Sequence, residues 1–155
     1  GAGNVGRECA KRFSAMGCRV YGADLYPVKS DWFEDVLPMS ELASLLKTAD
    51  LVVLTLPLTE DTKNLFDKDK FFNMKDGAVL VNISRGAVVN TDDLIETLNT
   101  KLGGAVLDVF ETEPLDENSP LWDMENVIIT PHNSFVGEGN NTRLFDVVIN
   151  NLKNC

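Results

Sequence analysis

The sequence predicts an α/β protein, a doubly wound parallel sheet in three layers with helices on both faces. Three observations support this prediction. Short apolar runs alternate along the 155 residues with stretches whose apolar residues recur at helical spacing. Residues 51–56 and 78–83 are apolar almost throughout, which is typical of strands buried on both faces of a parallel sheet. The chain also opens on a glycine-rich loop that leads directly into a helical pattern.

The first element is the loop Gly1-Ala2-Gly3-Asn4-Val5-Gly6, a GxGxxG motif, followed by a helix predicted over residues 7–16. In such a loop the first glycine makes a tight turn and the second lets the backbone approach a pyrophosphate. The third glycine allows close packing of helix on strand, and the helix N-terminus faces the negative charge. For this motif alone, an ordinary glycine turn is the alternative.

A strand predicted up to Asp24 follows the helix stop at Gly17. Asp24 lies eighteen residues past Gly6, where a carboxylate accepts hydrogen bonds from the adenosine ribose hydroxyls and repels a 2′-phosphate. The acid therefore favours NAD over NADP, and a solvated loop aspartate is the alternative. A dinucleotide loop ordinarily follows a strand, but no residue precedes Gly1 and the sequence lacks an initiator Met. We therefore expect residues 1–155 to be an NAD-binding domain that is incomplete at both ends.

The remaining elements follow in order along the chain. Between Asp24 and Ser40 the sequence predicts only a turn, around Pro27. Ser40 is a candidate N-cap for the next helix, and Asn90 with the acids after it caps a later one. Predicted helices cover residues 40–46, 67–74, 94–98 and 143–152. Predicted strands cover residues 51–56, 78–83, 104–109 and 127–129. Right-handed crossovers between these strands leave the loops at the carboxyl edge of the sheet for chemistry.

Composition limits the classes of function. The formal net charge is −10, so nucleic acid and anionic membranes, which reward clusters of Lys and Arg, are not expected partners. The longest apolar runs are too short to span a bilayer and no signal-peptide pattern is visible, so we expect a cytoplasmic protein. Cys9, Cys18 and Cys155 form an odd set without CxxC spacing, so neither a disulfide framework nor a metal site is expected.

Polar residues that a scaffold does not need follow several predicted strands, among them Asp24, Arg85, residues 108–113 and His132. His132 is the only histidine, and it follows an apolar run that Pro131 ends. Imidazole is the commonest general acid or base, and a guanidinium such as that of Arg85 holds a carboxylate with two parallel hydrogen bonds. Each residue has a structural alternative. A lone histidine is more often structural than catalytic, and an isolated arginine or glutamate more often lies on a solvated surface.

Five motifs occur in this order along the chain: residues 1–6 with Asp24, Leu56-Pro57-Leu58-Thr59 with Thr62, Asn82-Ile83-Ser84-Arg85-Gly86, Leu107-Asp108-Val109-Phe110 leading to Glu113-Pro114, and Thr130-Pro131-His132. Together they resemble the NAD-binding domain of the D-isomer-specific 2-hydroxyacid dehydrogenases. The resemblance implies a Rossmann-like fold, NAD as cofactor and a small 2-oxo or 2-hydroxy acid as substrate. It also implies a homodimer and a second, substrate domain in full-length members, and this domain is absent from the chain.

The resemblance implies that His132 is the catalytic acid/base, Glu113 its carboxylate partner and Arg85 the substrate anchor. Hydride delivery to a 2-oxo acid places negative charge on the carbonyl oxygen, and a protonated imidazole supplies the proton that neutralises it. A carboxylate beside the imidazole favours the charged ring and fixes which ring nitrogen faces the substrate. Arg85 then binds the substrate carboxylate and orients the carbon toward the nicotinamide.

By the same resemblance, a larger set of residues lines the cofactor site. They lie on the glycine loop or at strand exits, and they are Gly1, Gly3, Asn4, Val5, Gly6, Asp24, Leu56, Pro57, Thr62, Ile83, Ser84, Arg85, Asp108, His132 and Ser134. Asn4 and Val5 offer backbone amides to the pyrophosphate, whereas Ile83 and Asp108 lie near the nicotinamide.

One departure from the family pattern, one disfavoured chemistry and two alternatives bear on this interpretation. Residues 133–137 read Asn-Ser-Phe-Val-Gly where many family members have small residues, so the wall beside the imidazole is expected to be bulkier. Formate-dehydrogenase-like chemistry is disfavoured because that branch has Gln where Glu113 stands. A nicotinamide-sensing, corepressor-like protein is one alternative, since it can keep the same three residues. The other is that the chain by itself is inactive.

Overall fold

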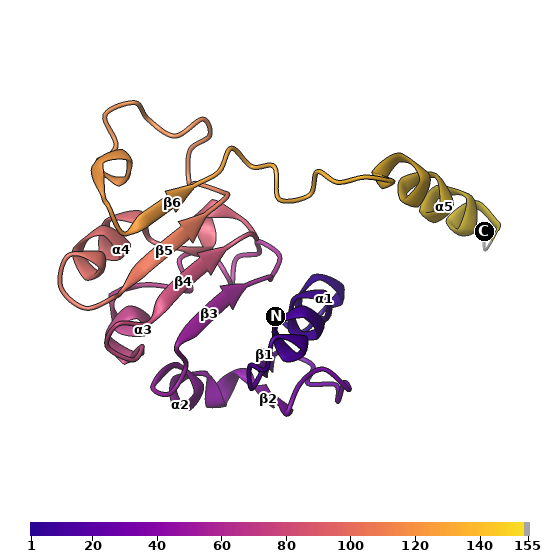
Figure 1. Ribbon diagram of the computed structural model, residues 1–155, viewed down its shortest axis with the longest axis horizontal. Helices are drawn as coiled ribbons and strands as arrows, with labels where there is room; N and C mark the ends of the chain where they lie inside the picture. Colours follow the sequence, from indigo (N-terminus) through magenta and orange to yellow (C-terminus); the bar gives the residue numbers. More distant parts are fainter. Residues whose placement is uncertain (154–155) are drawn as a thin grey trace.

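The computed structural model describes residues 1–153, in which parallel strands and helices alternate (Figure 1). One pair of strands consists of β1 (Tyr21–Asp24) and β2 (Asp35–Pro38). A second, parallel sheet has the order β3 (Leu51–Leu54), β4 (Val79–Asn82), β5 (Gly104–Leu107) and β6 (Val127–Ile129). The helices are α1 (Asn4–Ala15), α2 (Leu42–Leu46), α3 (Lys68–Asn73), α4 (Thr91–Leu98) and α5 (Asn140–Lys153). The predicted α/β class with parallel strands is confirmed.

The glycine loop lies where the two groups of strands meet. The Thr55 hydroxyl, just after β3, donates a hydrogen bond to the Gly1 carbonyl at 2.8 Å. On the other side, the Ala2 amide donates to Asp24 Oδ2, at the end of β1, at 2.7 Å. The loop is therefore fixed between the carboxyl ends of β1 and β3, which is where ligands bind in open α/β sheets.

One face of the β3–β6 sheet forms the hydrophobic core with the helices that follow its strands. Leu80 and Ala105 are adjacent in the register and fully buried, and Phe71 of α3 and Leu94 of α4 pack over the same face. The Asn90 side chain accepts a hydrogen bond from the Asp93 amide at 3.0 Å and caps α4, as the sequence predicts. This packing holds the sheet, and hence the loops at its carboxyl edge, in place.

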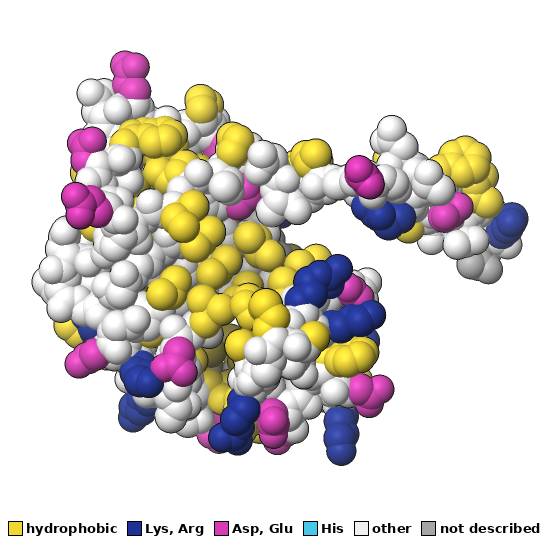
Figure 2. Space-filling model, in the orientation of Figure 1, with side chains coloured by type: hydrophobic (Ala, Val, Ile, Leu, Met, Phe, Trp, Pro, Cys, Tyr) yellow, Lys and Arg dark blue, Asp and Glu magenta, His cyan; other side chains and the backbone are white. Residues whose placement is uncertain are grey.

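The opposite face is covered less completely. Val53, Val81, Val106 and Ile128 lie side by side in the register, and the Ile128 side chain is 61% exposed. In Figure 2 hydrophobic side chains are visible over this part of the molecule. α5 buries none of its described residues and stands apart at the end of an extended segment (Figure 1). The expectation that helices cover both faces is therefore met only in part within residues 1–153.

Several local predictions are wrong or shifted. β2 lies in a segment for which the sequence predicts only a turn. The strand was not predicted because its four residues begin with Asp and end with Pro, and both residue types are rare in strands. Ser40 does not cap α2, since it lies inside a 3₁₀ turn (Met39–Glu41) and no side chain caps either helix. Predicted strands run past their observed ends because apolar exit residues such as Leu56 and Val109 still pack on the core.

Two findings concern the other expectations drawn from composition. Cys9 and Cys18 are free thiols, and Cys155 lies outside the described residues. Within residues 1–153, each helix falls short of the length and hydropathy that crossing a membrane requires.

Candidate active site

The candidate catalytic residues leave one edge of the sheet on neighbouring strands. Leu54, Asn82, Leu107 and Ile129 are adjacent in the register and form the last row of the β3–β6 sheet. The exit loops after β4, β5 and β6 therefore start at the same edge. They carry Arg85, residues 108–113 and His132, respectively. The middle loop, which carries the acids, lies between the loops that carry the guanidinium and the imidazole.

His132 and Glu113 are in direct contact. Nδ1 of His132 lies 2.7 Å from Oε2 of Glu113, and the two side chains are 42% and 37% exposed. The other Glu113 oxygen, Oε1, accepts a hydrogen bond from the Phe110 amide at 3.1 Å. The hydrogen bond with His132 is the main reason that the pKa of Glu113 is lowered, and the Phe110 amide lowers it further. Because Nδ1 faces the carboxylate, Nε2 is the ring nitrogen left to meet a substrate.

The His132 backbone is in the left-handed region, with φ of 51°, which is uncommon for residues other than glycine. Its amide donates to the Thr130 carbonyl at 3.1 Å, so the chain turns tightly around Pro131. The Phe135 ring stands edge-on to the imidazole, with ring centroids 6.3 Å apart and planes at 85°. A bulky side chain therefore does lie beside the imidazole.

Asp108, the first residue after β5, is buried with 1% exposure and holds the loop that carries His132. Its Oδ1 accepts hydrogen bonds from the Thr130 hydroxyl at 2.5 Å and the Asn133 amide at 2.9 Å. Its Oδ2 accepts from the Ser134 amide at 3.0 Å. Burial alone would raise the pKa of Asp108, but the hydrogen bonds from Ser134, Thr130 and Asn133 outweigh it and lower the pKa to about 2. The carboxylate is therefore charged at neutral pH.

Arg85 is exposed at the exit of β4, and its Nη1 donates to the Ser84 carbonyl at 2.7 Å. The buried Asn82 side chain shapes this turn. Its Oδ1 accepts from the Ser84 amide and hydroxyl at 3.1 and 2.7 Å, and its Nδ2 donates to the Arg85 carbonyl at 3.2 Å. The guanidinium therefore projects from a fixed turn with donors available for an anion.

Gly86 brings the exits of β4 and β5 together. A Cβ at this position would lie 1.8 Å from the Phe110 carbonyl carbon, so only glycine fits. This close approach sets the turn that bears Arg85 against the loop that bears Glu113.

The glycine loop fits the pyrophosphate of a dinucleotide. α1 begins at Asn4 without a side-chain cap, so its first amides are available to an anion. A Cβ on the exposed Gly3 would meet nothing within 4 Å beyond its chain neighbours, whereas a Cβ on Gly6 would lie 2.2 Å from the Gly1 carbonyl oxygen. Gly3 thus leaves open space for a phosphate, and Gly6 is required by close packing.

Asp24 lies beside this loop. Its carboxylate accepts from the Ala2 amide at 2.7 Å and the Tyr26 amide at 3.0 Å. Partial burial acts to raise the pKa of Asp24, but these amides lower it overall. A charged carboxylate at the end of β1 is the arrangement that favours ribose hydroxyls over a 2′-phosphate.

The remaining cofactor candidates lie on the same edge. The Thr62 hydroxyl donates to the Pro57 carbonyl at 2.8 Å and accepts from the Thr59 amide at 2.7 Å, which closes the loop after β3. Leu56 is partly buried against the core and Ile83 is half-buried. Ser84 and Ser134 both contribute backbone amides to the bonds made by Asn82 and Asp108.

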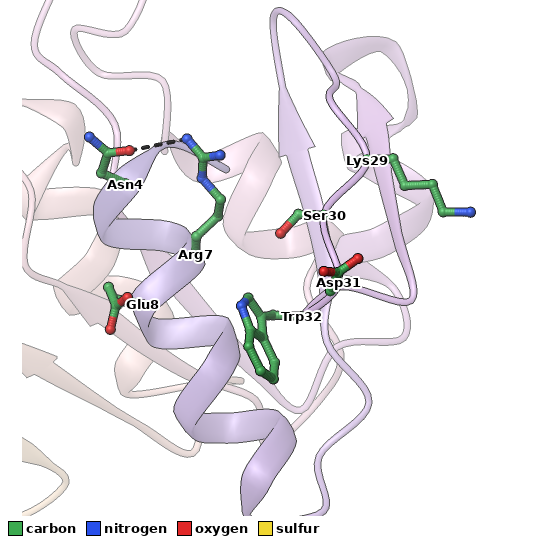
Figure 3. A pocket seen from close by; sticks show the side chains of 7 residues that line it. All are labelled: Asn4, Arg7, Glu8, Lys29, Ser30, Asp31 and Trp32. Atoms are coloured by element: carbon green, nitrogen blue, oxygen red, sulfur yellow. Dashed lines mark hydrogen bonds between the residues drawn. The ribbon is translucent and has the colours of Figure 1, made fainter.

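A polar pocket of about 500 Å³ lies between the start of α1 and the loop before β2 (Figure 3). Its lining residues are Asn4, Arg7, Glu8, Lys29, Ser30, Asp31 and Trp32. In Figure 3 the Arg7 side chain points toward Asn4, to whose Oδ1 it donates at 3.1 Å, and the Trp32 ring lies beside α1. Arg85, Glu113 and His132 do not line this pocket, so it adjoins the glycine loop rather than the candidate catalytic residues.

Sequence reasoning missed the residues that hold the loops. Motifs in the sequence contain Thr130, Asn82 and Gly86, but they do not indicate that these residues hold the loops. A signal was present, because a polar residue such as Asn82 at the end of an otherwise apolar strand must find partners when it is buried. The partners themselves are backbone groups of neighbouring loops, and no residue pattern specifies them.

The chain is similar to proteins of one known family. The family model described as the D-isomer specific 2-hydroxyacid dehydrogenase, NAD binding domain, matches residues 1–134. A D-2-hydroxyacid dehydrogenase (NAD(+)) of Clostridioides difficile is 42% identical over 149 residues, covering 87% of this chain and 45% of that protein. An (S)-sulfolactate dehydrogenase of Chromohalobacter salexigens is 37% identical over 155 residues, covering 99% of this chain and 50% of that protein.

Solved structures give the same result. An NADPH-dependent glyoxylate/hydroxypyruvate reductase from Sinorhizobium meliloti, in complex with NADP and sulfate, superposes with a TM-score of 0.89 at 33% identity, covering 99% of this chain and 49% of that chain. A phosphoglycerate dehydrogenase from Lactobacillus plantarum superposes with a TM-score of 0.87 at 35% identity, covering 99% and 50%. The chain thus spans about half the length of these relatives. It belongs to the D-isomer-specific 2-hydroxyacid dehydrogenase family and matches the NAD-binding domain of that family.

Proposed function

We propose that this chain is the NAD-binding domain of a dehydrogenase that transfers a hydride between NAD(H) and carbon 2 of a small 2-oxo or 2-hydroxy acid, with D configuration at that carbon. The observation that carries the proposal is the 2.7 Å contact between Nδ1 of His132 and Oε2 of Glu113, at the sheet edge from which Arg85 also projects. Relatives named as D-lactate dehydrogenase and hydroxypyruvate reductase support the reaction class. The substrate domain lies outside residues 1–155 in this proposal.

The roles of the three residues follow from their positions. When bound, the nicotinamide supplies or accepts the hydride. His132 holds a proton at Nε2 and gives it to the substrate oxygen during reduction, and it takes that proton back during oxidation. Glu113 keeps Nδ1 protonated and stabilises the charged ring, because it accepts the Nδ1 hydrogen bond. The Arg85 guanidinium binds the substrate carboxylate with two parallel hydrogen bonds.

We further propose that the cofactor is NAD rather than NADP. The glycine loop accepts the pyrophosphate at the uncapped start of α1, in front of Gly3. Asp24 accepts hydrogen bonds from the adenosine ribose, and its negative charge opposes a 2′-phosphate. The remaining candidates on the loops after β3, β4, β5 and β6 line the cleft from adenosine to nicotinamide.

The assignment is tested by NADH oxidation with a panel of 2-oxo acids, in the protein that carries this chain. His132→Ala should lower kcat by at least about a hundredfold, because general acid catalysis contributes that much or more. Arg85→Lys should mainly raise KM for the 2-oxo acid, since lysine cannot form the bidentate contact. The exposed Lys47→Ala, near the other end of β3, serves as the control and should behave as wild type. Retention of most activity by His132→Ala would overturn the proposed mechanism.

We also propose that the enzyme is a cytoplasmic homodimer. The partly exposed apolar row that includes Val81, Val106 and Ile128 supports an interface, and the free thiols of Cys9 and Cys18 fit a reducing compartment. Sedimentation velocity should give a dimer at micromolar concentration, and a monomer at every concentration would argue against it.

A further inference from the structure

The loop that carries His132 is tied to a single buried side chain. Asp108, with 1% exposure, accepts hydrogen bonds from the Thr130 hydroxyl, the Asn133 amide and the Ser134 amide at 2.5, 2.9 and 3.0 Å. Both carboxylate oxygens are engaged, and the three donors lie on both sides of His132 in the sequence. The carboxylate thus holds the loop before and after the imidazole without a hydrogen bond to the imidazole itself among the described contacts.

His132 needs such support. Its φ of 51° lies in the left-handed region, which is less favourable for histidine than for glycine. A strained backbone persists only where its surroundings fix it, and here the fixing groups are the bonds to Asp108. In this conformation Nδ1 of His132 lies 2.7 Å from Oε2 of Glu113, which is on the loop after β5, five residues beyond Asp108.

We propose that Asp108 is a positioning residue for the reaction: its carboxylate holds residues 130–134 so that His132 keeps its left-handed backbone and its Nδ1 contact with Glu113. This inference rests on the proposed function, since it assigns the support of the proposed acid/base. It differs from the cofactor contact expected for Asp108 from sequence, because the groups it binds belong to the loop. Charged groups close to this carboxylate are Glu113 and, when protonated, His132.

The Thr130 hydroxyl offers the cleanest way to weaken this support. Thr130→Val keeps the shape of the side chain and removes the donor to Asp108, whereas Thr130→Ser keeps the donor and removes a methyl group. Because His132 is the only histidine, the ¹⁵N spectrum of its ring reports the Nδ1–H tautomer without overlap. We expect the Thr130→Val variant of the chain to lose the signal of a single ring tautomer. In the protein that contains this chain, the same substitution should lower kcat by about tenfold to a hundredfold and change KM less than about twofold.

Thr130→Ser should keep both the ring signal and kcat near their wild-type values. If Thr130→Val fails to fold, Thr130→Ala also removes the hydroxyl that donates to Asp108 and is measured in the same way. The proposal is overturned if the folded variant has the wild-type ring signal and kcat while only its melting temperature falls, since Asp108 would then be merely structural. If even the wild type reduces no 2-oxo acid, the proposed function fails, and the ring signal alone still decides whether Asp108 positions His132.

Discussion

Asp108 is the residue whose chemistry depends most on the loops around it. In an unfolded chain its carboxyl group titrates at an ordinary aspartate value, but in the fold three donors around a buried carboxylate lower its pKa to about 2. A lowered pKa means that the folded state binds the proton less tightly than the unfolded state. The stabilisation is therefore fully present above about pH 4 and is lost as the pH falls toward 2.

We predict that this residue makes an identifiable contribution to acid unfolding. The shift from 3.8 to about 2 corresponds to about 2 kcal/mol of unfolding free energy, most of which should disappear by pH 2. Urea unfolding of wild type and Asp108→Asn between pH 6 and pH 2 checks this, because the difference between the two proteins should shrink by about that amount. A difference that is constant across this range would contradict it.

At this scale, motifs in the sequence identified the candidate residues, but most of their partners could not be predicted. Arg85, Glu113 and His132 were identifiable from motifs, and the implied contact between Glu113 and His132 is present. The bonds made by Asn82 and Asp108 were not predictable, because their partners are backbone groups that only the tertiary structure brings near. The left-handed backbone at His132 was likewise not predicted, because the residue type favours it only weakly.

At the scale of elements, two glycines have different structural roles in the loops. Gly86 lets the loop after β4 touch the backbone of the loop after β5, and Gly3 leaves open space at the start of α1. The same substitution should therefore have different effects at the two sites.

We expect Gly86→Ala to lower the free energy of unfolding by about 1–3 kcal/mol, because a Cβ at 1.8 Å from the Phe110 carbonyl carbon must displace one loop. Gly3→Ala should unfold like wild type but bind NAD more weakly, since its methyl group occupies the space in front of the helix N-terminus. Denaturant unfolding and calorimetric titration of NAD check the pair. Equal loss of stability in both variants would contradict this account of the loops.

The same scale shows which elements a sequence can predict. β3 and β4 were expected because a buried parallel strand reads as a continuous apolar run, and α4 because Asn90 and two acids mark its start. β2 was missed because its four residues owe their pairing to the neighbouring β1 rather than to their own pattern. Pairing between strands is a tertiary property, so a short edge strand leaves little trace in sequence.

At the scale of the whole molecule, stability is distributed unevenly. The core lies between one face of the β3–β6 sheet and the helices α3 and α4, whereas α5 stands apart with its apolar residues exposed (Figures 1 and 2). α5 was predicted from its amphipathic pattern, but the pattern alone does not say which surface covers it.

This distribution predicts the effect of matched truncations. Leu80→Ala, at a residue with 0% exposure, should lower the free energy of unfolding by about 2–5 kcal/mol. Leu144→Ala, at a residue of α5 with 64% exposure, should change it by less than about 0.5 kcal/mol. Urea unfolding of the chain measures both. A large loss for Leu144→Ala would mean that α5 contributes to the folded core in solution.

The product of the reaction is the most direct test of the proposed reduction of a 2-oxo acid to a D-2-hydroxy acid by NADH at this sheet edge. The protein that carries this chain is incubated with 2-oxo acids and NADH deuterated at the transferable position, and the products are separated by chiral chromatography and weighed by mass spectrometry. Wild type should form one D-2-hydroxy acid that carries one deuterium at carbon 2, and His132→Ala should form at least about a hundredfold less of it. An L product, or an undiminished D product from His132→Ala, would contradict it.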